Sequence, residues 1–466
     1  MKPIYIVSWL FALAVSFVSC DDWLDKTPKD RLYPDVYFKT EDELRLFTNQ
    51  FYNNLVPSAV DIYSESSDLI VKSDLMLEMS GQRIIPDEGN GWNFTALRDI
   101  NFYLQYSHNC TEVNARNRYD GVARFFRAYF YFEKVKRYGD IPWYDKALDS
   151  DDPELYKARD SREFVMQKML EDLDFAIANL PKTKNAYVLT RWTALALKSR
   201  VCLFEGTFRK YHGLEDCEKY LNACVSASET FMNESGYTLY KSGSTPYRDL
   251  FASINLQADE VIFGRDYEAS LSVLHNVQNY ENSTTMGRPG MNKKIVNSYL
   301  MADGSRFTDK AGYETMTFDQ ECQNRDPRLA QTIRTPGYTR IGSTKKEAPN
   351  LAYTMTGYHL IKYSMTANYD EYNKSCNDIP LFRTAEVYLN FAEAKAELGT
   401  LKQADINKSI KLLRDRVGMT NLDMELANSK PDPYLMSAAT GYPNVKGANQ
   451  GVILEIRRER TIELAM

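Results

Sequence analysis

The sequence predicts a mainly helical protein with a loop-rich insertion and a few short strands. Apolar residues recur at spacings of three and four along most of the chain, as in 42–55, where they gather on one helix face. The segments with this period follow one another in pairs joined by short turns, a pattern typical of helical-repeat scaffolds. Only the middle of the chain departs from it, so we expect the irregular part there.

Seven segments carry the helical period, and several of them have recognisable end signals. Ser161 is the expected N-cap of one helix, which should end at Pro181, while another should end at Gly139, with Pro142 just beyond. The predicted helices are 42–55, 118–142 as far as Gly139, 161–181, 190–208, 214–231, 378–399 and 403–418.

The middle of the chain reads differently. The stretch 260–268, EVIFGRDYE, has alternating and β-branched character, which predicts a short strand. The following segment, 271–289, is polar, rich in Asn and without period, which predicts a long surface loop. Because loops held on a rigid scaffold often carry binding sites, this loop is a candidate ligand-binding region.

One helical pair resembles a tetratricopeptide unit. In AEVYLNFAEAKAELGTLKQA, four residues match its small and turn positions: Ala392, Leu398, Gly399 and Ala404. Small residues at these places let two helices approach closely. The second helix lacks the downstream pattern, so the repeat is degenerate and alone predicts only a helical solenoid.

Composition and charge do not suggest a nucleic-acid partner. The 466 residues are 44% hydrophobic and 26% charged, as in ordinary globular proteins, and the net charge of −6 comes from acids and bases that are mixed along the chain. The densest basic cluster is RRER at 457–460, but Glu455, Glu459 and Glu463 interleave with it. We therefore expect a solvated or ion-paired helix face there.

The N-terminus resembles a bacterial lipoprotein signal. An apolar run of about 15 residues, 4–18, follows Lys2 and is shorter than the roughly 20 residues of a membrane-spanning helix. Cleavage after Ser19 would leave Cys20 as the acylated N-terminus, although Phe17 stands where such signals usually carry Leu. Two or more acyl chains give a stable membrane anchor. The alternative is an ordinary signal peptide with an incidental cysteine.

Cysteines and histidines give no support for a metal site or a cofactor. No CxxC occurs, and the four histidines neither cluster nor lie at ligand spacing. Cys217 and Cys224 fall two turns apart on one predicted helix, too far for a disulfide. Cys202 could face either of them across a helical hairpin, the other possibility being buried free thiols.

Four stretches together resemble the SusD/RagB family of surface glycan-binding lipoproteins from Bacteroidetes. They are the acidic segment after Cys20, RFFRAYFYFEKVKRYGDIP, NSYLMADGSRF at 297–307, and RTAEVYLNFAEAKAELG followed by LLRDRVG. The resemblance covers nearly the whole chain. It implies eight helices in four tetratricopeptide-like pairs, with a less regular part that presents the ligand. It also implies a partner, an outer-membrane TonB-dependent transporter of the SusC type, which the family member covers as a hinged lid.

The resemblance suggests a domain organisation. Residues 1–19 would be the lipoprotein signal peptide, 20–260 the N-terminal part with the helix pairs, and 261–466 the C-terminal part. Family members continue past the helix that here reads GVILEIRRERTIELAM, so we expect the C-terminal part to be truncated at Met466. The acidic pair after Cys20 resembles the export tag that sends such lipoproteins to the outer face of the outer membrane.

The implied mechanism is capture of a glycan without catalysis. Sugar rings have apolar faces surrounded by hydroxyls, so a binder needs aromatic platforms flanked by polar side chains. Two loop-like stretches offer both, GQRIIPDEGNGWNF, which also contains Asp87 and Asn90, and 271–290. The predicted platforms are Trp92 and Tyr280, and the predicted hydrogen-bonding residues are Arg83, Asn93 and Asn279.

Three tryptophans leave alternatives open or point to the core. Trp92 could instead staple the N-terminus of the following helix. Trp143 could be a third platform or a buried anchor, and Trp192 lies in an apolar helical pattern typical of the core. Two alternative functions also remain: uptake of peptides, as in relatives of the RagB kind, and a helical glycoside hydrolase, although the sequence contains no GxSxG, HExxH or P-loop motif.

Overall fold

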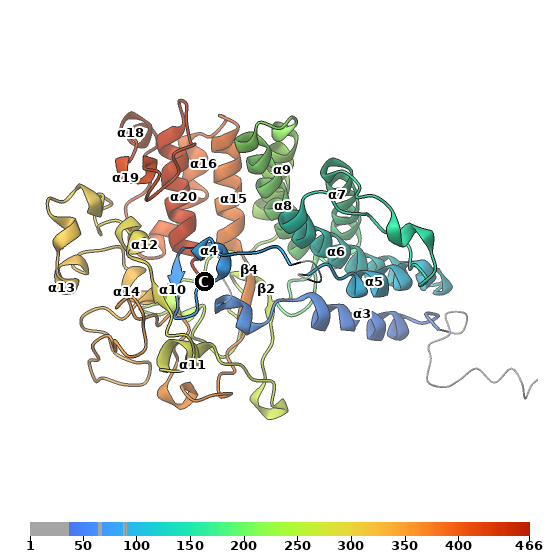
Figure 1. Ribbon diagram of the computed structural model, residues 1–466, viewed down its shortest axis with the longest axis horizontal. Coiled ribbons are helices and arrows are strands. Elements are labelled where there is room, and N and C mark those ends of the chain that lie inside the picture. The colour runs from blue at the N-terminus through green and yellow to red at the C-terminus, as the bar shows by residue number, and fades with distance from the viewer. Residues whose placement is uncertain (1–36, 64–67, 87–88, 90) are drawn as a thin grey trace, which may run out of the picture.

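Eight helices of at least twelve residues form the frame of the part of the chain that the computed structural model describes, residues 37–63, 68–86, 89 and 91–466 (Figure 1). They are α3 (Glu41–Leu55), α5 (Thr95–Tyr106), α6 (Val113–Tyr138), α7 (Arg162–Asn179), α8 (Arg191–His212), α9 (Cys217–Glu234), α15 (Thr384–Glu397) and α20 (Gln450–Leu464). Helices α6 to α9 pack successively, α9 then packs on α15, and α15 packs on α20. The predicted mainly helical fold is confirmed.

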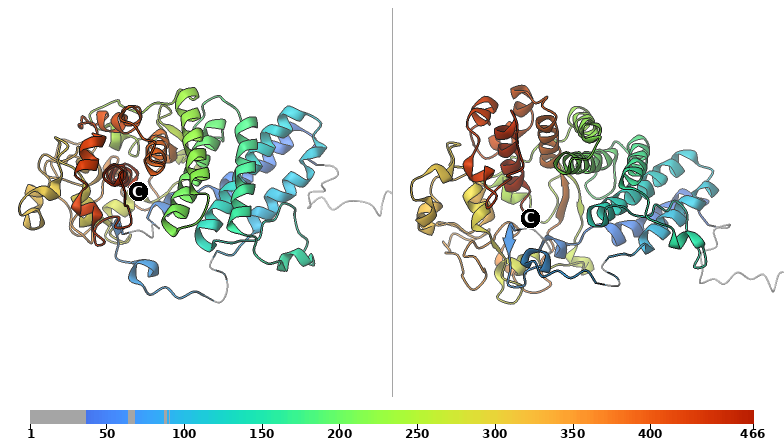
Figure 2. Two further views of the ribbon diagram at one scale, coloured as in Figure 1. Left: turned by 90° about the horizontal axis from the view of Figure 1, so that it is seen from above. Right: turned by 45° about the horizontal axis from the view of Figure 1, so that its top comes forward.

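An irregular part covers the end of the molecule opposite to α3 and α5 (Figure 2). It contains two small antiparallel sheets, one of β1 (Ile70–Val71) with β3 (Gly290–Met291) and one of β2 (Val261–Arg265) with β4 (Ile379–Arg383). Its short helices are α4 (Leu77–Ser80), α10 (Pro246–Asp249), α11 (Val277–Asn282), α12 (Lys293–Ser298), α13 (Phe318–Glu321) and α14 (Leu329–Thr332). Beside α20 lie α18 (Met424–Ser429) and α19 (Pro433–Met436).

The end signals in the sequence act as expected. The Ser161 hydroxyl accepts a hydrogen bond from the Phe164 N–H and so caps α7, as predicted. Gly139 ends α6 with a φ of 70°, a left-handed conformation that glycine adopts at little cost. Trp192 is buried, as predicted for a core residue, and its Nε1 donates to the Lys182 carbonyl.

Trp143 is also buried and stacks on Tyr131, with ring centroids 4.3 Å apart. The tyrosine hydroxyl donates to the Pro142 carbonyl and accepts from the Tyr144 N–H, so it fixes the chain on both sides of the tryptophan. Trp143 is therefore the buried anchor, one of the two roles considered for it, and not an exposed platform.

The segment 378–399 was expected to be one helix, and here the prediction is wrong. Its first residues form β4, which pairs with the predicted strand, now seen as β2. Close approach of the two strands requires Gly264, because a Cβ there would lie 2.6 Å from the Ile379 carbonyl oxygen. The helix α15 begins only after β4, at Thr384.

The predicted helix 403–418 is divided into α16 (Gln403–Asn407) and α17 (Ile410–Asp415). The break falls at Ser409, whose backbone leaves the helical region and whose hydroxyl donates to the Asp405 carbonyl. A serine hydroxyl that takes a helical carbonyl competes with the backbone in this way.

The segment 271–289 is not the surface loop that the sequence predicted. It contains α11, in which every residue except Tyr280 is buried. Polar side chains of α11 make hydrogen bonds to the segment 363–373, which is why the burial of this helix leaves no hydrophobic period in the sequence.

All six described cysteines are free, which confirms the free-thiol alternative. Cys202 and Cys224 share a small core between α8 and α9 with Leu221. Gly206 lets the two helices approach there, because a Cβ at this position would lie 2.7 Å from the Leu221 side chain.

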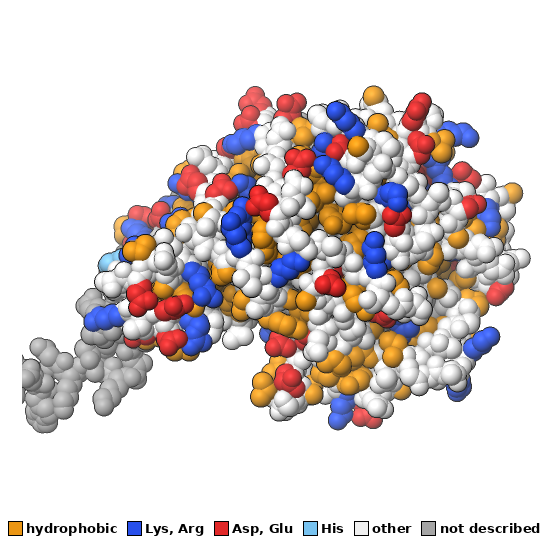
Figure 3. Space-filling model, turned by 180° about the vertical axis from the view of Figure 1, so that it is seen from behind, with side chains coloured by type: hydrophobic (Ala, Val, Ile, Leu, Met, Phe, Trp, Pro, Cys, Tyr) orange, Lys and Arg blue, Asp and Glu red, His pale blue; other side chains and the backbone are white. Residues whose placement is uncertain are grey.

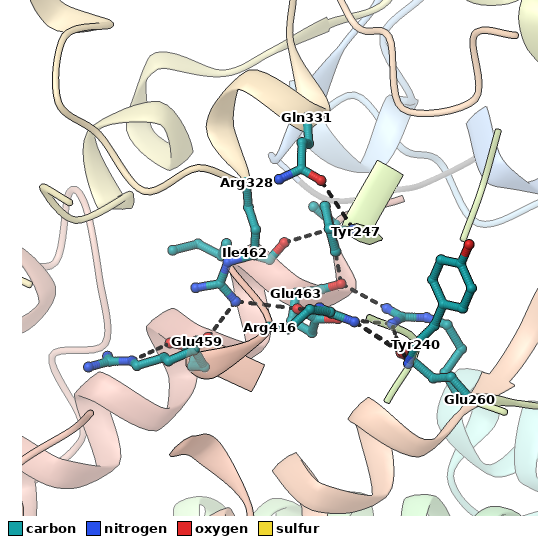
Figure 4. Close-up of polar contacts among 12 residues, drawn as sticks. Tyr240, Tyr247, Glu260, Arg328, Gln331, Arg416, Glu459, Ile462 and Glu463 are labelled. Atoms are coloured by element: carbon teal, nitrogen blue, oxygen red, sulfur yellow. Dashed lines mark hydrogen bonds and ion pairs between the residues drawn. The ribbon is translucent and has the colours of Figure 1, made fainter. Parts of the chain in front are cut away.

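The acidic and basic residues of α20 are ion-paired, as expected (Figure 4). Its three glutamates and Arg458 are buried, while Arg457 and Arg460 are half-buried. The Glu463 carboxylate accepts hydrogen bonds from Arg416 at 2.6 Å and Arg383 at 2.9 Å, and lies 3.3 Å from Arg328. Glu260 pairs with the same Arg383 and Arg416. The network therefore joins α20 to β2, β4, α14 and the end of α17.

The outer surface has no large region of one charge on the face shown in Figure 3, where acidic and basic side chains alternate around apolar patches. This arrangement agrees with the mixed charges of the sequence and with a net charge of −6. The face shown in Figure 3 carries no extended basic patch.

The first prediction concerns the buried network. Arg416→Met should lower the free energy of unfolding by about 3–5 kcal/mol, because it leaves Glu260 and Glu463 buried with less compensating charge. The matched control is Arg45→Met, which removes a solvent-exposed pair with Asp42 and should cost less than about 1 kcal/mol. Chemical denaturation measures both, and equal costs would contradict a stabilising role for the network.

The second prediction concerns acid stability. Burial raises the pKa of Glu463, but the guanidinium groups of Arg416, Arg383 and Arg328 outweigh this effect and lower the pKa to about 2. Its contribution to stability should be complete above about pH 4.5 and be lost as the pH falls towards 2. Denaturation midpoints measured over this range should depend less on pH in Glu463→Gln than in the wild type. Equal slopes would rule out this linkage.

Candidate ligand-binding site

A pocket with a volume of about 630 Å³ lies beside α11. Its walls come from the turn before β1, the end of β2, the segment 272–280 and the segment around Tyr372. The lining residues are Ser58, Ala59, Val60, Arg265, Tyr267, Ser272, Val273, Leu274, His275, Asn276, Val277, Tyr280, Met286 and Tyr372. A volume of this size is ordinary for a small-molecule site.

Three tyrosines from three segments line this pocket. Tyr267 is buried, and its hydroxyl accepts a hydrogen bond of 2.8 Å from the Ala59 N–H, which fixes the ring. Tyr280 is half-buried on α11, and Tyr372 is 65% exposed. A tyrosine ring offers an apolar face and a polar edge, so the set suits a ligand that has both characters.

His275 is a rigid and uncharged part of the same wall. Its Nε2 donates to the Asn377 carbonyl at 2.8 Å, and its Nδ1 accepts from the Val277 N–H. Burial lowers the pKa of His275 to about 4, so the ring is neutral at pH 7. Its ring edge lies against Tyr267, with centroids 4.4 Å apart. His275 therefore orients the pocket and brings no charge to it.

The charged side chain in the lining is Arg265, at the end of β2. Its Nη1 donates to the Val56 carbonyl at 2.9 Å, which holds the guanidinium beside the turn at 56–58. The lining contains no Asp or Glu among the residues that the structure describes. Its remaining polar groups are the side chains of Ser58, Ser272 and Asn276, together with His275.

Of the residues predicted in the 271–290 stretch, the structure brings Tyr280 into the pocket and leaves Asn279 out of its lining. Asn279 is buried, and its Nδ2 donates to the Asp370 carbonyl at 2.6 Å. Its amide therefore holds α11 in place, because its donor already has a partner inside the protein. Asn276, from the same stretch, lies in the lining instead.

Trp92 lines a second, smaller pocket of about 300 Å³, which it shares with Phe94, Leu97, Tyr144, Leu148 and Leu155 among others. The indole is 40% exposed and meets the rings of Phe94 and Tyr138 edge to face. Arg159 lies over it, 4.9 Å from the ring centroid. Trp92 therefore has two contacts: it packs on Phe94 at the start of α5, and its exposed part faces the pocket.

The other predicted residues near Trp92 do not line either of these two pockets. The Asn93 Oδ1 accepts a hydrogen bond of 2.8 Å from the Thr95 N–H at the start of α5. Arg83 is exposed, 3.4 Å from Glu78. Asp87, Asn90 and the predicted lipid attachment site Cys20 lie outside the described residues.

The structure separates the two predicted groups. Trp92 lies three residues before α5, and Tyr280 lies in α11. In Figure 1 α5 lies to the right and α11 at the bottom of the larger, left-hand part, so the two helices are well separated. The sequence analysis missed Arg265, Tyr267 and Tyr372. Tyr372 lies in YDEYNKS, a stretch as polar as 271–289 and likewise without a hydrophobic period. This similarity in composition is the feature of the sequence that could have indicated Tyr372.

Among the residues that the structure describes, no cluster of three or more His, Cys, Asp or Glu side chains is arranged to hold a metal ion. None of the described helices is both long enough and apolar enough to cross a membrane.

Two segments of the chain match models of known protein families. A family model described as "SusD family" matches residues 250–466, and one described as "Starch-binding associating with outer membrane" matches residues 82–191. SusD-like protein P2 of Formosa agariphila is 25% identical over 445 residues, which are 89% of this chain and 82% of the relative. SusD-like protein P25 of the same organism is 21% identical over 91% of this chain and 84% of the relative.

Solved structures share the fold. A SusD-like protein from Bacteroides fragilis superposes with a TM-score of 0.73 at 23% identity, covering 95% of this chain and 87% of the other. A SusD-like carbohydrate binding protein from the same species gives a TM-score of 0.71 at 18% identity, covering 92% and 84%. Residues 250–466 thus match the SusD family, residues 82–191 match a related SusD-like model, and the curated relatives and the fold agree with that assignment over most of the chain.

Proposed function

We propose that this protein captures oligosaccharides or a polysaccharide at the outer cell surface and delivers them to a TonB-dependent transporter of the SusC type, which it covers as a hinged lid. The observation that carries the proposal is the pocket with Tyr267, Tyr280 and Tyr372 in its walls. The family description "Starch-binding associating with outer membrane" and the solved SusD-like carbohydrate binding protein support a sugar as the ligand.

The chemistry of the lining suits a sugar. A pyranose ring presents C–H groups to an aromatic face and hydroxyls around its edge. Tyr280 and Tyr372 are the accessible platforms, and Arg265 supplies N–H donors beside them. The hydroxyl and ring oxygens of a sugar can accept hydrogen bonds from the guanidinium of Arg265.

The same lining favours capture over hydrolysis. Glycoside hydrolases use two carboxyl groups about 5–10 Å apart on either side of the scissile bond. The described lining of this pocket has neither Asp nor Glu. Binding can use the side chains that line the pocket. Hydrolysis would require two carboxyl groups, and none is among the described lining residues.

Trp92 remains a proposed second platform, at the smaller pocket beside α5. Arg98 and Lys146 lie in the same lining and could donate to hydroxyls of a longer chain. Since α5 and α11 are far apart in Figure 1, the two pockets would engage separate parts of one polysaccharide and increase its avidity. We keep Arg83 and Asn93 as proposed contacts of this second site.

The membrane attachment is proposed through Cys20. Acylation of this residue would tether the folded body to the outer membrane, and the acidic residues after it would direct export to the outer face. The association of the family with the outer membrane supports this location.

The third prediction tests the pocket. Tyr280→Ala and Tyr372→Ala should each weaken binding by about three- to tenfold, because a stacked aromatic ring contributes about 0.5–1.5 kcal/mol beyond its buried area. The measurement is affinity electrophoresis of residues 21–466 against starch, plant, host and microbial polysaccharides, with a peptide mixture tested by calorimetry. Tyr156→Ala is the matched control, since Tyr156 is 88% exposed and outside both pockets.

Trp92→Ala, measured in the same way, tests the second platform and should reduce retardation by long polysaccharides more than by short oligosaccharides. A folded wild-type protein that retains peptides but no glycan would overturn the proposal in favour of peptide uptake. Glycan binding that survives both tyrosine variants would move the site away from α11.

The fourth prediction tests the anchor. Cys20→Ser should release a folded protein from the membrane fraction, because the thiol that carries the acyl chains is removed. Fractionation without detergent, followed by circular dichroism of the released protein, measures the change. A variant that stays with the membrane would contradict attachment through Cys20.

A further inference from the structure

The helix α11 is tied to the segment 363–373 by a series of polar side chains. Gln278 donates to the Thr366 carbonyl and to Asp370, and its own oxygen accepts from the Met365 N–H. Further along, Asn282 donates to Ser364, whose hydroxyl donates to Glu281. These contacts run in opposite chain directions and hold α11 alongside the segment.

One contact of this series lies at the surface, beside the large pocket. The Asn276 Nδ2 donates to the Asn373 Oδ1 at 3.0 Å, and the Asn373 N–H donates back to the Asn276 Oδ1 at 2.6 Å. Asn276 lines the pocket, and Asn373 directly follows Tyr372, which also lines it. The pair therefore joins the wall that carries Tyr280 to the wall that carries Tyr372.

The chain around Tyr372 has little else to hold it. Residues 371–374 are all exposed, and within the described part of the protein their hydrogen bonds to other segments are the two made by Asn373. On either side the chain is fixed, at Asp370 by Asn279 and at Ser375 by the His275 N–H. Asn373 has a φ of 52°, a left-handed conformation that costs energy for a residue other than glycine and that its side-chain and backbone bonds offset.

From this arrangement we infer that Asn276 and Asn373 are positioning residues for the ligand. Their paired hydrogen bonds keep Tyr372 in the pocket wall with Tyr280, so that one sugar chain meets both rings. The inference rests on the proposed function, because it concerns the walls of the same pocket. Preorganised walls bind more tightly, since the ligand need not order the 371–374 segment on arrival.

The first arm of the test needs no ligand. Hydrogen exchange of the full chain, read at the Asn373 amide, should be about 3- to 10-fold faster in Asn276→Ala, because a hydrogen bond of this kind contributes about 0.5–1.5 kcal/mol. Asn276→Asp keeps an oxygen acceptor for this N–H and should restore most of the protection. The matched control is Asn421→Ala, which removes an exposed amide contact with Asn407 far along the chain. Unchanged exchange in Asn276→Ala would overturn the inference.

The second arm is a double-mutant cycle with amylopectin as the probe in native gels, or with the panel polysaccharide that retards the wild type if amylopectin does not. Asn276→Ala should weaken binding about 3- to 10-fold in the wild-type background and have no further effect in Tyr372→Ala. The same loss in both backgrounds would show that Asn276 does not act through Tyr372. A wild type that binds no polysaccharide counts against the proposed function, while the exchange arm still decides whether the pair holds Tyr372.

Discussion

The buried carboxylate of Glu463 joins the helical frame, through α20, to the irregular part of the fold. It is fully buried in α20 and is compensated by arginines from three distant segments, Arg328, Arg383 and Arg416. Burying one carboxylate without them would be very costly, so the helix, the strand end and the loop that supply these partners must come together for the chain to fold.

This constraint extends to the ligand pocket through the small sheet. Arg383 ends β4 and pairs with Glu260, which comes just before β2. Because the two strands are antiparallel, the network fixes the edge of the sheet where β2 begins and β4 ends. At its other end β2 delivers Arg265 and, two residues later, Tyr267 into the pocket. The opposite side depends on a second polar assembly, the amide contacts of α11. The site is thus held by buried polar groups on both sides, while the long helices supply the frame.

The sequence predicted the parts of this fold that depend on hydrophobic period. The long helices have it, and Ser161 and Gly139 mark ends that the structure contains. The prediction was wrong where the buried side chains are polar or charged. In α11 the buried residues are mostly amides and a carboxylate, and in α20 buried charges resembled a surface face. Of the predicted site residues, Tyr280 lies in the large pocket, but its neighbours Tyr267 and Tyr372 come from segments that only tertiary structure brings together.

The central claim is that a sugar lies between the walls of the pocket at α11. A crystal structure of the protein soaked with an oligosaccharide cut from its preferred polysaccharide tests this claim most directly. We predict a sugar ring against Tyr280 and Tyr372, with hydroxyls within hydrogen-bonding distance of Arg265. An oligosaccharide bound only beside Trp92, or on another surface with the α11 pocket empty, would contradict it.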